Sequence, residues 1–117
     1  MEGAVEIAGA AIQWAQSVGI ITDVKKIESE ALTVEDCGDV YFVAAFGGLL
    51  TPHYRDDARG LLIGMSQNTT RGHLMRAFIE SPCLRTAEVV AAMSSDANQK
   101  VTKMAVDGGM TVNNLLM

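Results

Sequence analysis

Two adjacent glycines near the end of the sequence constrain the fold more than any other feature. Gly108 and Gly109 lie between two stretches that each have four apolar residues in six, residues 101–106 and residues 112–117. A glycine has no Cβ atom, so the backbone can turn sharply here and lie close to a ligand. We expect a strand over 101–106, a tight turn, and a helix that begins near residue 112. The free N–H groups at such a helix start favour a phosphate or a sugar-phosphate group.

Upstream, the spacing of apolar residues changes repeatedly between the periods of strands and helices. The predicted elements are a short strand over 3–7, a helix over 8–18 ended by Gly19, a short helix from Thr22 or Asp23 to Leu32, strands over 40–46 and 61–65, and a long helix capped by Thr69 or Thr70 that reaches about Met93. A turn is expected at 36–39. This alternation predicts an α/β fold in which helices flank a mixed sheet.

The same spacing predicts which residues are buried. The expected buried faces are Ala8, Ala11, Ile12, Ala15 and Val18 in the first helix, Val24, Ile27 and Ala31 in the second, and Leu74, Phe78, Leu84, Ala87 and Ala91 in the long one. The strand over 40–46 is almost continuously apolar, which is typical of a strand covered on both faces. Pro82 should interrupt the long helix, because a proline clashes with the carbonyl four residues before it.

Composition excludes several classes of protein. The chain has 117 residues and a net charge of −5, with no basic block, so a nucleic-acid surface is not expected. Its longest nearly apolar run, residues 40–50, is too short to cross a bilayer. Glu2 and Glu6 stand where a secretion signal would carry positive charge, so none is visible, although a leader could have been lost from a fragment.

The polar residue types that could form a metal or catalytic site are few. Cys37, Cys83, His53 and His73 have no pair at metal-ligand spacing, and we predict no metal site. The two cysteines suit a reducing compartment. We expect His73 to be structural and Trp14 to be a core or interface anchor.

The loop around His53 admits two interpretations. His53, Asp56 and Asp57 together could perform acid–base chemistry. The interpretation we favour is a solvated loop in which Arg55 and Arg59 are the charge partners of the carboxylates.

Four stretches of the sequence stand out together: residues 3–14, 40–49, 58–65 and 106–114. In order, and with almost no gaps, they resemble the C-terminal domain of the FGGY carbohydrate kinase family. Among the residues that carry the resemblance are Gly60, Leu62, Gly64, Met65, His73, Leu74, Ala77 and Glu80. Residues 52–54, 58–60 and 106–114 are more similar to the glycerol kinases of that family than to its pentulose kinases.

The resemblance implies an actin-like ATPase (ribonuclease H-like) domain that is incomplete at both ends, with residues 1–117 forming the nucleotide-binding half of the C-terminal FGGY domain. It implies transfer of the γ-phosphoryl group of ATP, with Mg²⁺, to glycerol, giving sn-glycerol 3-phosphate. It also implies a cytoplasmic protein and a homo-oligomer. The family's catalytic aspartate and its glycerol-binding residues match positions upstream of this sequence, so no catalytic residue is assigned here.

The resemblance also assigns the nucleotide-binding residues: Gly9, Gln13, Gly109 and Asn113. Each glycine is followed four positions later by an amide side chain, which therefore lies on the same face of a helix. An amide there could bond to a purine edge or a ribose. The glycine pair alone would favour an ordinary tight turn, and the sequence contains neither a P-loop nor a dinucleotide-binding fingerprint.

Some positions depart from the family pattern, which leaves alternatives open. The departures are Ala44, Thr51, Tyr54, Phe78, Pro82 and Arg85. They indicate a diverged paralogue or a pseudogene-like locus. Two alternatives to a glycerol kinase stay open: another FGGY sugar kinase of the xylulose or gluconate type, or a non-catalytic protein with the actin fold.

Overall fold

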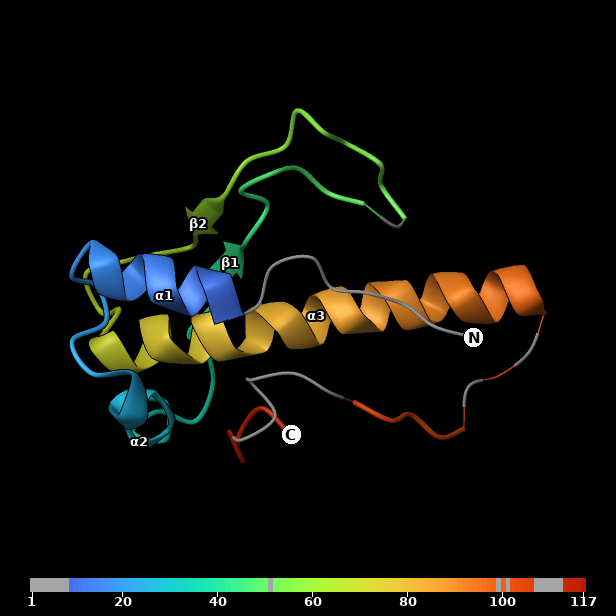
Figure 1. The fold of residues 1–117 in the computed structure, drawn as a ribbon. Coiled ribbons are helices and arrows are strands. Elements are labelled where there is room, and N and C mark those ends of the chain that lie inside the picture. The colour runs from blue at the N-terminus through green and yellow to red at the C-terminus, as the bar shows by residue number, and fades with distance from the viewer. Residues whose placement is uncertain (1–8, 51, 99, 101, 107–112) are drawn as a thin grey trace.

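The computed structural model describes residues 9–50, 52–98, 100, 102–106 and 113–117 of the chain. In chain order the elements are α1 (Gly9–Ser17), a 3₁₀ helix η1 (Val24–Lys26), α2 (Ile27–Ala31), β1 (Tyr41–Val43), β2 (Leu61–Ile63) and α3 (Arg71–Ala97). Figure 1 shows α1, α2 and the two strands gathered along the N-terminal half of α3, while its C-terminal half extends past them. The predicted alternation of helices and strands is confirmed, and in the described residues the sheet is an antiparallel pair.

Helix α1 ends at Ser17, one residue before the predicted end, and Gly19 terminates it as predicted. Gly19 adopts a left-handed φ of 87°, a conformation that costs glycine little and commonly terminates a helix. Ala11, Ile12 and Ala15 are buried as expected. The prediction for Val18 is wrong, since its side chain is 54% exposed. Val18 follows the last helical residue, so the helical period no longer determines the direction of its side chain.

The second predicted helix is split into η1 and α2. The side chain of Asp23 accepts a hydrogen bond from the backbone N–H of Lys25 and so caps η1. Ile27 and Ala31 are buried as predicted, but Val24 is 42% exposed. A 3₁₀ turn has three residues per turn, which places Val24 off the stripe expected of one continuous α-helix.

The strands are shorter than predicted and are covered on one face only in the described part of the chain. Phe42 is buried, whereas Tyr41 and its cross-strand partner Ile63 are 45% and 54% exposed. The prediction that both faces of this strand are covered is therefore wrong here. Strand β2 ends at Gly64, whose φ is 92°. A side chain at Gly64 would collide with the carbonyl of Asp39.

Helix α3 begins after Thr70, as predicted, and is longer than predicted. The backbone N–H of Thr70 donates to Nδ1 of His73 at 2.9 Å, so His73 has the structural role that the sequence indicates. The helix runs to Ala97, beyond the predicted end at Met93, and contains Pro82 without a break. The predicted interruption at Pro82 is wrong; the tertiary packing of the neighbouring turns maintains the helix despite the missing N–H.

The buried face of α3 also differs from the predicted stripe. Its buried residues are Gly72, Met75, Ala77, Phe78, Ile79, Ser81, Arg85 and Val89. Phe78 was predicted correctly, and Leu74 packs partly buried against the core. Leu84, Ala87 and Ala91 are exposed. They lie from the middle of α3 onward, and Figure 1 shows that the C-terminal half of this helix extends past the other helices and the strands.

The C-terminal stretch departs most from expectation. Residues 102–106 are exposed and form no strand, and Asn114–Leu116 form a turn rather than a helix. The predictions for these described residues are wrong, because a strand needs a paired neighbour and none of the described strands lies beside them. The predicted strand over 3–7 and the Gly108–Gly109 turn lie outside the described residues.

Candidate functional site

The first pair of predicted nucleotide-binding residues lies on α1. Gly9 is the first residue of the helix, and Gln13 is one turn further along and exposed. Ala11 and Ile12 are held in the core and fix the rotation of the helix. A Cβ atom built on Gly9 would have no atom within 4 Å. No neighbour in the described chain therefore requires a glycine here, and the space beside it is open to a ligand.

Asn113 lies in a turn that is docked on α2 and α3. Its Oδ1 atom accepts a hydrogen bond from the backbone N–H of Leu116 at 3.0 Å. The backbone N–H of Leu115 donates to Oε1 of Glu28 on α2 at 3.1 Å, and Sγ of Cys83 on α3 donates to the Leu116 carbonyl at 3.7 Å. Leu115 and Leu116 pack against the hydrophobic core.

The described contacts do not join the two pairs of predicted residues. The hydrogen bonds of residues 113–117 outside their own turn are with α2 and α3, and Figure 1 shows this segment on the opposite side of α3 from α1. Gly109 lies outside the described residues. The assignment of Gly9, Gln13, Gly109 and Asn113 to one nucleotide site therefore stays a prediction.

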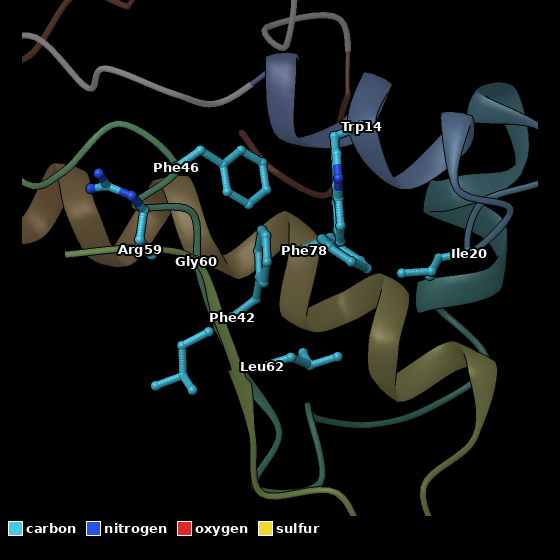
Figure 2. A pocket seen from close by; sticks show the side chains of 9 residues that line it. Trp14, Ile20, Phe42, Phe46, Arg59, Gly60, Leu62 and Phe78 are labelled. Atoms are coloured by element: carbon cyan, nitrogen blue, oxygen red, sulfur yellow. The ribbon is translucent and has the colours of Figure 1, made fainter. Parts of the chain in front are cut away.

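An apolar pocket, which sequence analysis missed, lies between α1, the two strands and α3 (Figure 2). Its volume is about 360 Å³, and it is lined by Trp14, Ile20, Phe42, Phe46, Arg59, Gly60, Leu61, Leu62 and Phe78. The Trp14 and Phe46 rings are in contact, with centroids 5.1 Å apart. The apolar walls suit an apolar group rather than a phosphate. The one residue of this pocket that sequence analysis singled out is Trp14, which was expected to be a core or interface anchor.

The loop before β2 contains ion pairs rather than an acid–base pair. The Arg55 guanidinium bonds to both carboxylate oxygens of Asp57, at 2.8 and 2.7 Å, and this contact lowers the pKa of Asp57. The preferred interpretation, a solvated loop with charge partners, is confirmed for this pair. Sequence analysis missed the partner of His53, whose Nε2 lies 2.6 Å from a carboxylate oxygen of Glu88 on α3.

The described residues contain no group of three or more His, Cys, Asp or Glu side chains that could hold a metal ion. Both cysteines are free, and burial is the first cause of the raised pKa of the Cys37 thiol. Within the described part of the chain, no helix combines the length and the apolar character needed to cross a membrane.

The comparisons with known proteins determine the family. The model of the C-terminal domain of the FGGY family of carbohydrate kinases matches residues 1–117. This chain belongs to that family. It is 45% identical over its whole length to a probable glycerol kinase of Dictyostelium discoideum and 48% identical to a glycerol kinase of Methylorubrum extorquens. It covers 22% and 24% of those proteins, so the FGGY chain spans about a quarter of the curated relatives that it matches.

Solved structures agree on the fold of the FGGY chain. A crystal structure of Plasmodium falciparum glycerol kinase with ADP superimposes with a TM-score of 0.88 and 33% identity, over 97% of this chain and 23% of that one. A xylulose kinase from Bifidobacterium adolescentis has a TM-score of 0.77 and 21% identity, over 93% and 21% of the two chains, and supports the fold alone. The predicted actin-like, ribonuclease H-like fold class is confirmed.

Proposed function

We propose that this chain is part of an ATP-dependent glycerol kinase that forms sn-glycerol 3-phosphate, and that it supplies part of the ATP site. The observation that carries the proposal is identity of 43–48% with glycerol kinases along the entire chain. Among solved structures the identity is 33% with a glycerol kinase but only 21% with a xylulose kinase. We further propose that the complete protein is cytoplasmic and homo-oligomeric.

In this proposal Gly9, Gln13, Gly109 and Asn113 contact the nucleotide. The open space beside Gly9 allows the backbone to approach a ligand. Gln13 is exposed and presents an amide on α1, and Asn113 presents a second amide from its turn. The glycerol kinase that resembles this chain in structure was crystallised with ADP.

The proposal places the chemical step outside these residues. Phosphoryl transfer depends on a positioned acceptor hydroxyl and on neutralisation of the phosphate charge. The described residues do not offer a cluster of metal ligands, so we assign no Mg²⁺ ligand here. Mg²⁺ commonly binds through substrate phosphates and one or two carboxylates. The catalytic aspartate is expected in the remainder of the complete protein.

The test uses the complete gene product. ADP release in a coupled assay should be fast with glycerol and slow with xylulose or gluconate, and the 117-residue chain alone should give no turnover. Faster ADP release with xylulose or gluconate than with glycerol would indicate that the protein is another FGGY sugar kinase. Nucleotide binding without turnover on any of the three would favour the non-catalytic paralogue.

A matched pair of variants tests the site. Gln13→Ala should weaken ADP binding by about two- to tenfold through the loss of a hydrogen bond, at roughly 0.5–1.5 kcal/mol. Gln16→Ala, also exposed on α1, should leave ADP binding unchanged. Equal affinities of the two variants would remove Gln13 from the site.

A further inference from the structure

The turn that contains Asn113 is held by a side chain from a distant part of the sequence. Glu28 is half-buried on α2, and its Oε1 lies 3.1 Å from the backbone nitrogen of Leu115, 87 residues away. The other restraints on the turn are the packing of Leu115 and Leu116 on the core and the weak thiol contact of Cys83. Packing of leucines is not directional, whereas a hydrogen bond to a carboxylate fixes both distance and orientation.

The hydrogen bonds of the turn determine which atoms of Asn113 remain for a ligand. A backbone N–H can only donate, so the atom that bonds to the Leu116 nitrogen at 3.0 Å is the amide oxygen of Asn113. Among the described residues the amide nitrogen has no hydrogen-bond partner, so its two N–H donors remain for a ligand. Asn113 can therefore offer donors to an acceptor atom, such as a ring nitrogen or an oxygen of a nucleotide.

We propose that Glu28 is a positioning residue for nucleotide binding: its carboxylate holds the Leu115 N–H and so fixes a turn in which Asn113 directs its amide N–H₂ group to an acceptor atom of the nucleotide. This inference rests on the proposed function, because it deepens the role of Asn113 in the ATP site. Glu28 itself does not contact the nucleotide in this scheme.

Variants of Glu28 test the positioning role in the complete protein. Glu28→Ala should weaken ADP binding in calorimetry by about tenfold or more and raise KM for ATP by a similar factor, since a hydrogen bond to a charged group is stronger than one between neutral groups. KM for glycerol should not change. Glu28→Gln keeps an oxygen acceptor and should recover most of the affinity. Glu30→Ala is the control, because it removes another carboxylate of α2, whose partner is Arg71.

Several outcomes would overturn the role of Glu28. One is an unchanged ADP affinity in Glu28→Ala, and another is equal effects of Glu28→Ala and Glu30→Ala. A third is a Glu28→Gln variant that binds ADP as weakly as Glu28→Ala, when both variants have the thermal stability of the parent. If Glu28→Ala fails to fold, the comparison of Glu28→Gln with the parent remains, and a loss of ADP affinity above threefold would contradict the proposal.

Variants of Asn113 test the direction of its hydrogen bonds. Asn113→Asp keeps the oxygen that accepts from Leu116 but replaces the donors by an acceptor, so it should weaken ADP binding at least as much as Asn113→Ala. If Asn113 served only to cap the turn, Asn113→Asp would bind ADP like the parent. If the parent protein binds no nucleotide, the proposed function is refuted. If the parent binds ADP but the variants bind it equally well, only the roles of Glu28 and Asn113 are refuted.

Discussion

The rings of Phe42 and Phe78 meet edge to face, with centroids 4.5 Å apart, and join β1 to α3. Phe42 also contacts Phe46 at 6.1 Å, and Phe46 contacts Trp14 on α1. Phe78 departs from the family pattern, where a smaller residue is expected. In this chain its side chain is only 2% exposed and is part of the core.

Truncation of Phe78 should therefore be costly. Phe78→Ala in the complete protein should lower the free energy of unfolding by about 3–5 kcal/mol, because it leaves a cavity between β1 and α3. Leu84→Ala, at a site on α3 that is 48% exposed, should lower it by less than about 1 kcal/mol. Urea unfolding of both variants makes the comparison, and similar losses would mean that Phe78 is not a core residue.

At Gly72 helix α3 lies close to the end of α2 and the segment that follows it. A Cβ atom at Gly72 would collide with the hydroxyl of Thr33 and lie 2.8 Å from the carbonyl oxygen of Glu30. Gly72→Ala should therefore destabilise the protein by about 1–3 kcal/mol, as overpacking does. Gly9→Ala is the control for stability, since no atom lies near that position. A Gly72→Ala variant as stable as the control would show that the two segments separate easily.

Pro82 offers a stabilising substitution. Helix α3 continues through this residue, so an N–H is missing in a helix that is otherwise regular. Pro82→Ala should raise the free energy of unfolding by about 2 kcal/mol, after allowance for the greater freedom of the unfolded chain. Pro52→Ala, in an exposed turn, should have little effect. A loss of stability in Pro82→Ala would contradict the view that the proline weakens the helix.

Gly109 is tested through affinity. Gly109→Val should weaken ATP binding by about 2 kcal/mol or more, because a branched side chain would fill the space in which nucleotide is predicted to meet the backbone. Calorimetric titration of the folded complete protein measures the change. Gly47→Val, in open space on a loop, should bind ATP like the parent. Unchanged affinity in Gly109→Val would refute the assignment of this glycine.

The 117 residues expressed alone should bind the dye ANS and self-associate. Tyr41, Leu61 and Ile63 leave one face of the strand pair exposed, and open strands with exposed apolar residues associate readily. Leu115 and Leu116 add little to this exposed surface, since both pack partly buried on the core. A monomeric preparation with a sharp, cooperative thermal transition and no ANS binding would contradict this prediction.

The sequence predicted best where local chemistry and packing agree. The period of Ala11, Ile12 and Ala15 identified the buried face of α1, and Thr70 identified the start of α3. The prediction of burial failed where the helical spacing of apolar residues continues beyond the elements that pack on α3, as at Leu84. It also failed over 102–106, because apolar composition alone does not create a neighbouring strand.

The residues of the candidate site stay a prediction, and their arrangement in space could not be predicted from the sequence. Gly9 and Gln13 are four residues apart, and helix geometry therefore places them on the same face of α1. The contact of Glu28 with Leu115 joins residues 87 positions apart, and no local pattern encodes such a pairing. The partner of His53 was missed for the same reason, since Glu88 lies 35 positions away.

The long separation between Glu28 and Leu115 has a consequence for biosynthesis. A ribosome makes the chain from its N-terminal end, so α2 emerges well before the turn that it must hold. The carboxylate of Glu28 stays in water until residue 115 arrives, and the loop to be closed is long. Contacts of such separation form late and slow folding. The turn that contains Asn113 should therefore be among the last parts of this chain to become ordered, and if it binds nucleotide as proposed, ATP would stabilise the molecules that have completed it.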